Sequence, residues 1–345
     1  MNIKKIILEY KNIFILFFIT RFLFIIFSLL THNNITDVFM LMDSENYFHI
    51  ANFGYDENKY FAFFPLVPLL IKIFDVIGII IINNILTLFS SIFIQKEFNK
   101  NAAILFLLSP IQIYCYIPYT ESIFIFLSIV SFYFYKNRKY ILSGICLGLG
   151  VCDRSMMSMM FFTLFIFMCY KFYKKECKLI DIIKMYIPAT ILSCLYPFYL
   201  LIKTGNWKIF VDIQYQNWDA EQSNIFRTIK NDIISFIHQD TYGKYLIFLT
   251  YFTFILLLIV FIQYKNIDKE LILYTFLTIL IIFSTCKVLY LEASFPPSTS
   301  YFRYFLSCFP LYIALSKYKQ KYIRLIFVIF QILISCNFII NGWPF

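Results

Sequence analysis

The chain has 345 residues, of which 61% are hydrophobic and only 14% are charged. A soluble domain needs more charge than this for its exterior, so the composition excludes an ordinary soluble globular protein. The formal net charge is +10, but the basic residues form short clusters between apolar runs rather than one basic face, so we expect no nucleic-acid partner.

Apolar runs suited to membrane helices follow one another along the chain. The first is too long for the apolar part of a signal peptide and has no small-residue cleavage site, so we expect it to remain as the first span. We predict a single membrane domain, residues 1–345, with about 11 transmembrane helices. The predicted spans are 12–31, 66–95, 102–118, 120–135, 140–152, 155–170, 182–202, 245–264, 271–291, 302–316 and 323–340.

Two longer polar stretches, 32–65 and 203–244, interrupt the spans. Most of the 30 lysines and arginines fall in alternate connections, which places the N-terminus in the cytoplasm by the positive-inside rule. Both polar stretches and most acidic residues outside the basic clusters then lie on the opposite side. In a eukaryotic cell that side is the lumen of the endoplasmic reticulum.

The first polar stretch carries Asp43 and Glu45 close to the end of the first span. His49 and Tyr55 follow at spacings that suit one face of an interfacial helix lying along the bilayer. An aromatic and proline-rich segment, 61–68, then leads into the second span. The alternative interpretation is a solvated loop with an aromatic belt at the membrane interface.

Three more polar residues lie at predicted turns on the same side. Glu121 begins a predicted helix, where the alternative role is a carboxylate that stabilises the helix N-terminus. Asp153 and Arg154 occupy a turn embedded in the membrane, and such charges are costly unless they are used or paired with each other. The preceding glycines, within 144–150, favour close helix packing over phosphate binding.

Arg303 stands at the head of a later predicted helix, where the helix dipole disfavours a cation. A bound anion or a partner carboxylate would account for it. Arg21 in the first span and Lys287 in the ninth are further intramembrane cations. Each is a functional candidate by default, although we expect Lys287 to extend its side chain toward the interface.

These groups suit the transfer of a sugar from a lipid phosphate to a hydroxyl group. Asp43 is placed to accept the hydroxyl proton. The leaving phosphate is already a good anion, and Arg154 or Arg303 would stabilise it. The three histidines and nine cysteines are scattered, so we predict no metal site and no cofactor.

The same segments resemble the GPI mannosyltransferase 2 (PIG-V) family, membrane glycosyltransferases of the GT-C type. Its members read W-D-x-x-H/W-F-x-x-I-A-x-x-G-Y and then A-F-F-P-x-x-P-L. The chain departs from the family in having Met42 in place of the tryptophan, and Met156 and Met157 in place of the asparagine and glycine after the later Arg-Ser pair. It is also shorter than many relatives, chiefly in its later luminal region. Later family motifs read Y-[ST]-E-[SA]-L-F, V-R-S-N-G and R-Y…F-P. The matching segments here are 42–55, 62–69, 109–110, 119–124, 151–155 and 298–310.

The resemblance implies a GT-C-type helical bundle with luminal interfacial helices in the endoplasmic reticulum membrane. It also implies transfer of the second, α-1,6-linked mannose from dolichyl-phosphate mannose to the GPI precursor glycolipid, with inversion and without a metal. An accessory membrane subunit is left open. Asp43 is then the general base and Glu45 a second catalytic candidate. The predicted substrate contacts are His49, Tyr55, Phe64, Pro65, Tyr119, Glu121, Arg154, Ser300, Arg303 and Tyr304.

Three other functions are alternatives. A GT-C enzyme that uses another polyprenyl-phosphate sugar or another acceptor would need the same charged groups. A transporter or lipid flippase is less favoured, because the chain shows no repeat and its charges gather at one face instead of the midplane. An inactive scaffold subunit would have no need to retain Asp43, Glu121 and Arg303.

Overall fold

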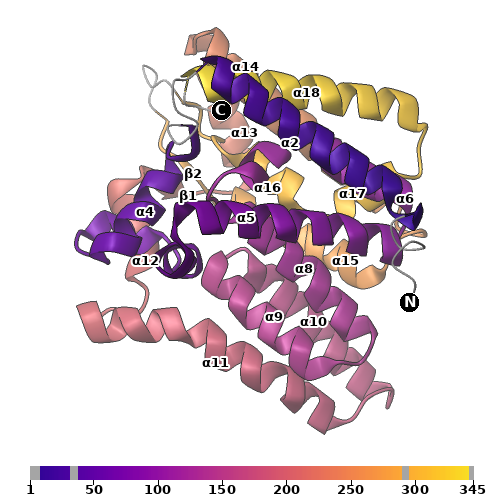
Figure 1. The fold of residues 1–345 in the computed structure, drawn as a ribbon. Helices are drawn as coiled ribbons and strands as arrows, with labels where there is room; N and C mark the ends of the chain where they lie inside the picture. The colour runs from indigo at the N-terminus through magenta and orange to yellow at the C-terminus, as the bar shows by residue number, and fades with distance from the viewer. Residues whose placement is uncertain (1–7, 32–37, 290–294, 342–345) are drawn as a thin grey trace.

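The computed structural model describes residues 8–31, 38–289 and 295–341, and this part of the chain is almost entirely helical (Figure 1). Its first half contains α2 (Lys11–Thr31), α4 (Asp43–Phe53), the 3-10 helix η1 (Asn58–Ala62), α5 (Leu66–Glu97), α6 (Lys100–Leu108), α7 (Gln112–Tyr116), α8 (Glu121–Lys136), α9 (Tyr140–Asp153) and α10 (Met157–Tyr173). Its second half contains α11 (Leu179–Thr204), α12 (Ile209–Asn217), β1 (Ala220–Gln222), α13 (Ile225–His238), α14 (Thr241–Ile262), α15 (Lys269–Phe283), β2 (Thr285–Lys287), α16 (Tyr301–Ser307), α17 (Pro310–Leu315) and α18 (Gln320–Asn341).

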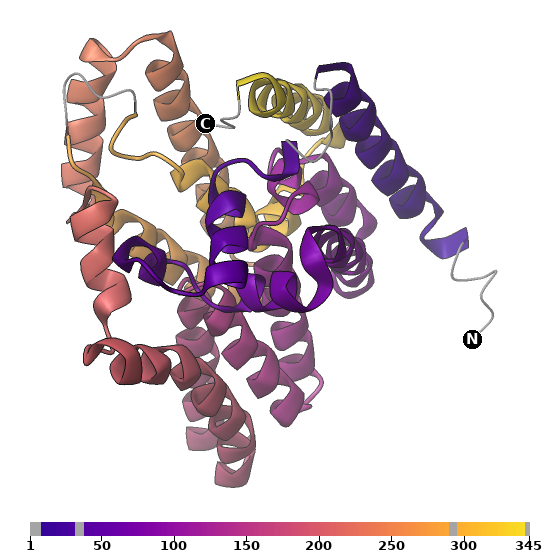
Figure 2. The ribbon, with the colours of Figure 1, turned by 60° about the vertical axis from the view of Figure 1, so that its left-hand side comes forward.

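Five of the described helices, α2, α5, α11, α14 and α18, are long and apolar enough to cross a membrane. They lie toward the outside of the molecule, with α2 and α18 side by side (Figures 1 and 2). They also expose large apolar side chains, such as Phe22 on α2 and Ile77 on α5. Exposed surface of this kind is stable against lipid but not against water. The helices thus agree with the predicted all-α, multi-pass membrane protein.

Two segments predicted as single spans are each broken into two short helices. The span predicted at 102–118 divides into α6 and α7, and the one predicted at 302–316 divides into α16 and α17. The first break falls at Ser109, which is extended before Pro110, as the residue before a proline usually is. The second falls just before Pro310, which occupies the start of α17.

These short helices form the interior of the protein. All residues from Ala102 to Ile117 are buried, as are all residues of α17. The hydroxyl of Tyr312 donates to the carbonyl of Leu306 at 2.6 Å and contacts the Ser109 hydroxyl at 2.9 Å, so one side chain satisfies polar groups at both breaks. Interrupted helices are tolerated at membrane depth where protein surrounds them in this way.

The predicted span at 271–291 also differs from the structure. Helix α15 ends at Phe283, and the next residues form β2, which pairs antiparallel with β1. Lys287 is therefore part of a strand instead of a span, and its ammonium group donates to the carbonyl of Trp218. Residues 290 and 291 lie outside the described part of the chain.

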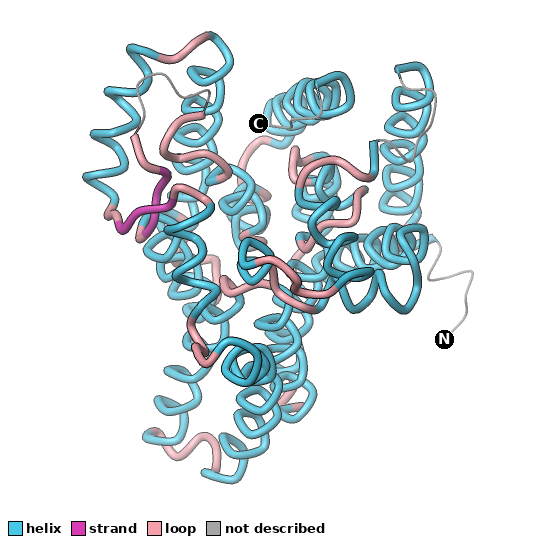
Figure 3. The backbone as a smooth tube through the Cα atoms, turned by 90° about the vertical axis from the view of Figure 1, so that its left-hand side faces the viewer, coloured by secondary structure: helices cyan, strands magenta, loops and turns pink. Residues whose placement is uncertain are grey.

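The elements of the two polar stretches gather at one end of the long helices. Helices α4 and α12 and the two strands lie together at the left of Figure 1, and Figure 3 looks onto this end. Helices α9 and α11 pack below them, and a Cβ atom at Gly144 would lie only 1.9 Å from the carbonyl oxygen of Met185. The packing role predicted for these glycines is confirmed.

Candidate functional site

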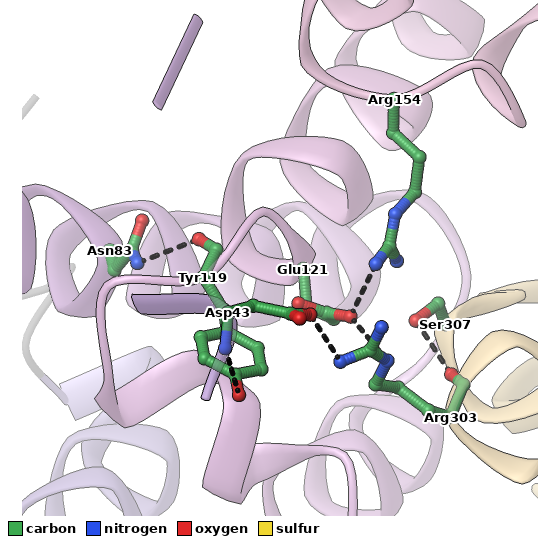
Figure 4. Close-up of polar contacts among 7 residues, drawn as sticks. All are labelled: Asp43, Asn83, Tyr119, Glu121, Arg154, Arg303 and Ser307. Atoms are coloured by element: carbon green, nitrogen blue, oxygen red, sulfur yellow. Dashed lines mark hydrogen bonds and ion pairs between the residues drawn. The ribbon is translucent and has the colours of Figure 1, made fainter. Parts of the chain in front are cut away.

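Charged side chains from four helix ends meet at one place (Figure 4). Asp43 and Glu121 are the first residues of α4 and α8, where the positive end of the helix dipole favours a carboxylate. Arg154 directly follows α9, and Arg303 lies in the first turn of α16. Residues separated by as many as 260 positions in the sequence thus meet at one place.

The four residues form a continuous chain of ion pairs. Arg303 Nη1 lies 3.1 Å from Asp43 Oδ2, and Arg303 Nε lies 3.2 Å from Glu121 Oε1. Arg154 Nη2 donates to the same Glu121 oxygen at 2.8 Å. The side chain of Glu121 is fully buried, whereas that of Asp43 is 28% exposed. Glu121 therefore anchors the two guanidinium groups, and Asp43 is the carboxylate that a substrate can reach.

Aromatic rings complete the surroundings of the two arginines. The ring centre of Tyr304 lies 5.1 Å from the Arg154 guanidinium carbon and 5.4 Å from that of Arg303. The rings of Tyr114 and Tyr119 lie 5.2 and 5.6 Å from Arg303. These cation–π contacts add attraction and fix the planes of the guanidinium groups.

A second layer of hydrogen bonds holds the backbone of the site. The Tyr119 hydroxyl accepts from the Asp43 amide at 3.3 Å. Asn83 of α5 donates to the carbonyls of Ile117 and Tyr119 at 2.7 and 3.0 Å. The Ser307 hydroxyl donates to the Arg303 carbonyl at 2.8 Å. The sequence reasoning missed Asn83, although a polar residue inside an apolar run was a signal for it.

Two predicted residues of α4 do not join this cluster. Glu45 is exposed, and no ion pair links it to Arg154 or Arg303 in the described structure. His49 lies 2.9 Å from an Asp56 oxygen and stacks on the ring of Tyr60. The hydrogen bond from His49 lowers the pKa of Asp56. His49 thus stabilises the turn after α4 instead of facing Asp43.

The other motif residues shape the scaffold around the site. The Tyr55 hydroxyl donates to the Phe63 carbonyl at 2.9 Å, Phe64 packs against Tyr196, and Pro65 caps α5. Ser300 has a left-handed backbone, with φ of 74°, and its carbonyl accepts from the Arg303 amide at 3.1 Å. Ser300 thereby starts the turn that carries Arg303.

Asp153 and Arg154 do not form the pair that their adjacency suggests. The chain leaves helix α9 at Arg154, which has an extended backbone with φ of −157° and ψ of 133°. Arg154 consequently binds Glu121, while both carboxylate oxygens of Asp153 are buried and make no hydrogen bond within the described residues.

Arg21 is buried away from the cluster, in α2. Its guanidinium donates to the side-chain oxygens of Asn84 at 3.1 Å and Gln112 at 2.9 Å. These bonds join α2 to α5 and α7, so the contacts of Arg21 are those of a structural residue. Within the described residues, no group of three or more histidines, cysteines, aspartates and glutamates is close enough to hold a metal ion.

The arrangement offers one accessible carboxylate beside two guanidinium groups that ion pairs hold in place. Such an arrangement is chemically suited to accepting a proton at Asp43 and to stabilising negative charge near Arg154 and Arg303. Comparison of the chain with family models, with curated proteins and with solved structures gives no match. The function is therefore inferred from the site and from the sequence motifs.

Proposed function

We propose that the chain is a membrane glycosyltransferase that moves a sugar from a polyprenyl phosphate to a hydroxyl group of a lipid-linked acceptor. The observation that carries this proposal is the accessible Asp43 carboxylate, ion-paired with Arg303 next to Arg154 and Glu121. The motifs that contain these four residues further support the GPI mannosyltransferase 2 reaction. In that reaction dolichyl-phosphate mannose is the donor and the GPI precursor is the acceptor.

In the proposed step the acceptor oxygen attacks the anomeric carbon of mannose from the face opposite the phosphate. A bond forms between the acceptor oxygen and the anomeric carbon while the bond between that carbon and the phosphate oxygen breaks. The configuration at the anomeric carbon therefore inverts. Asp43 receives the hydroxyl proton. The bonding electrons leave with the dolichyl phosphate, whose added negative charge is stabilised by Arg154 and Arg303. Neither a metal nor a redox cofactor takes part in this scheme.

The proposal includes the cellular setting that the charge pattern predicts. The enzyme is a GT-C-type protein of the endoplasmic reticulum membrane, with about 11 transmembrane helices. Its N-terminus is cytoplasmic and its active site is luminal. Its partners are the two lipid substrates and the surrounding membrane lipids.

The test uses cells that lack the second GPI mannosyltransferase and express the wild type, Asp43→Asn or Glu45→Gln at equal levels. We expect rescue of GPI-anchored surface proteins by the wild type and Glu45→Gln, but not by Asp43→Asn. Rescue by Asp43→Asn together with failure of Glu45→Gln would move the proton acceptor to Glu45. The two residues share one helix, so each variant is the folding control for the other.

Membranes from the same cells separate the alternative reactions. Wild-type membranes supplied with dolichyl-phosphate mannose and the GPI precursor should add one mannose, visible by mass spectrometry. Transfer of glucose from dolichyl-phosphate glucose, with no transfer from dolichyl-phosphate mannose, would favour another GT-C enzyme. Loss of rescue by correctly located wild-type protein, with no transfer from either donor, would remove the proposal.

A further inference from the structure

Helices α4 and α5 pack against each other and leave an open cavity of about 530 Å³ between them. Its lining includes Phe48 and Asn52 of α4 and Lys72, Phe74 and Asp75 of α5. The volume is within the range of about 300–1,000 Å³ that is typical of small-molecule sites. None of the four charged residues of the candidate site lines this cavity, so it is a separate feature of the molecule.

Asp75 has a strained backbone at the edge of this cavity. It interrupts α5 with φ of 63° and ψ of 176°, a combination that is adopted almost only by glycine. A glycine would take this conformation without the steric cost that a side chain brings. Strained residues cluster at binding and catalytic sites, so we expect the side chain of Asp75 to have a function.

The cavity presents one charge of each sign without a protein partner. Lys72 and Asp75 are exposed, and neither takes part in an ion pair within the described residues. One carboxylate oxygen of Asp75 accepts from the Val76 amide at 2.7 Å, which leaves the other oxygen for a ligand. The side-chain nitrogen of Asn52 donates to the Phe48 carbonyl at 2.9 Å, so the side-chain oxygen of Asn52 is left as an acceptor.

The position of these charges along α5 matches a membrane boundary. The part of α5 after the break, residues 76–97, is about 33 Å long at ~1.5 Å per residue, close to the ~30 Å hydrocarbon thickness of a bilayer. Lys72 and Asp75 precede this part and therefore lie at the level of the lipid head groups. Exposed apolar side chains continue along the same helix at four-residue spacing and share one face; they are Ile77, Ile81, Ile85 and Phe89.

A zwitterionic head group with a primary ammonium complements this arrangement. The ammonium of Lys72 suits a phosphate. The carboxylate of Asp75 and the side-chain oxygen of Asn52 are acceptors and suit an ammonium that carries N–H donors. A trimethylammonium group has no N–H to donate, and a purely anionic head group would be repelled by Asp75.

We propose that the cavity between α4 and α5 binds the head group of phosphatidylethanolamine, with Lys72 on its phosphate and with Asp75 and Asn52 on its ammonium. The acyl chains lie along the exposed apolar face of α5. This lipid is neither the sugar donor nor the acceptor, so the inference goes beyond the proposed function and does not depend on it. Because the lipid contacts both helices, it also holds α4, whose first residue is Asp43, against α5.

The test uses the full-length protein in nanodiscs that contain equal amounts of phosphatidylethanolamine, phosphatidylcholine and phosphatidylglycerol. Native mass spectrometry of the released protein measures which lipids remain bound. The wild type should retain phosphatidylethanolamine about fivefold more than either of the other lipids. Asp75→Asn should remove this preference. Lys72→Met should lower the retention of all three lipids, because each of them carries a phosphate.

Two further variants control for folding and for position. Asp75→Gly removes the carboxylate and relieves the strained backbone, so it should lose the preference and yet unfold at no lower temperature than the wild type in phosphatidylcholine alone. Lys96→Met changes an exposed lysine in the last turn of α5, outside the cavity. It should retain the three lipids as the wild type does.

Four results would overturn the inference. The first is equal retention of phosphatidylethanolamine and phosphatidylcholine by the wild type. The second is a preference for phosphatidylglycerol that Lys72→Met abolishes, which would make the occupant an anionic lipid. The third is a preference for phosphatidylethanolamine that survives in both Asp75 variants, and the fourth is its loss in Lys96→Met. These measurements involve no sugar transfer, so such results would leave the glycosyltransferase proposal intact.

Discussion

The outer long helices and the inner short helices have similar apolar sequences but opposite surroundings. In the five long helices only 28–39% of the most apolar window is buried within the protein. In contrast, Ala102 to Leu108 of α6 and all of α17 are buried. High hydropathy indicates that a segment is shielded from water, but it does not indicate whether lipid or protein surrounds the segment.

This difference determines where the chain can be interrupted. A lipid-facing helix must satisfy its own backbone, whereas an inner helix can break where neighbouring side chains supply hydrogen bonds. Gln112 does so at the first inner break, where its side-chain amide donates to the Phe106 carbonyl, and Tyr312 does so at the second, where its hydroxyl donates to the Leu306 carbonyl. Two of the four charged site residues are next to these inner segments, since Glu121 follows α7 and Arg303 lies on α16. The interrupted apolar segments thus lie beside the candidate site.

The largest expected effect is a difference in transfer activity between variants of two buried arginines, Arg303 on an inner helix and Arg21 on an outer helix. Arg303→Met leaves Asp43 and Glu121 without their shared cation, so we expect at least a hundredfold loss of mannosyl transfer. Arg21→Met removes hydrogen bonds to neutral partners on α5 and α7. It should reduce stability but keep transfer within about threefold of the wild type, once protein amounts are equalised.

Initial rates in membranes, with dolichyl-phosphate mannose as donor, measure both variants. Arg303→Lys is the control that restores the charge but not the planar two-sided geometry, and it should recover only part of the activity. If Arg21→Met loses as much activity as Arg303→Met, at equal protein levels, the functional distinction between inner and outer helices is wrong.

The second effect concerns packing and uses one phenylalanine from each class. Phe305 of α16 is fully buried and packs on Phe254 and Phe283 at ring distances of 5.5 and 5.9 Å. Phe305→Ala should cost about 3–5 kcal/mol. Phe22 of α2 is 64% exposed, and Phe22→Ala should change stability by less than about 1 kcal/mol. Unfolding in the same detergent measures both, and similar losses would show that another surface covers α2.

The sequence predicted the outer helices well and the inner helices poorly. The predicted first span, 12–31, differs by one residue from α2. The prediction at 102–118 failed because its uniform hydropathy hid the break at Pro110, although a proline inside a helical pattern usually ends or bends the helix. Likewise Pro310 signalled the start of α17 within the predicted span 302–316.

The sequence also identified the charged residues of the site but not their partners. The motifs contained Asp43, Glu121, Arg154 and Arg303, and the fold brings all four together. Adjacency suggested a pair between Arg154 and Asp153, but Arg154 leaves helix α9 with an extended backbone and pairs with Glu121 of α8. The ion-pair partner of a side chain depends on which helix ends lie close together in space. The spacing of residues within one segment of the sequence does not contain that information.

The smallest expected effect concerns a link between the two classes of helix. Asp232 of α13 accepts from the hydroxyl of Tyr251 on outer helix α14 at 2.7 Å and from the amide of Ser298, ahead of inner helix α16, at 3.1 Å. Burial raises the pKa of Asp232 from 3.8 to about 6, and the two hydrogen bonds oppose this shift. Tyr251 and Tyr301 are the titratable groups whose charges interact with Asp232.

The sign of the pH effect follows from the raised pKa. Between pH 4 and pH 6 the folded protein retains a proton on Asp232 that the unfolded chain has released, so the free energy of unfolding falls as pH rises. The stabilisation is complete below about pH 4 and lost above about pH 6, a change on the order of 1–3 kcal/mol. Asp232→Asn retains an acceptor for Ser298 and does not titrate. The free energy of unfolding of the wild type, relative to that of this variant, should therefore decline from pH 4 to pH 6. A constant difference would mean that Asp232 keeps its ordinary pKa. The link between α14 and the α16 segment would then be equally strong at every pH.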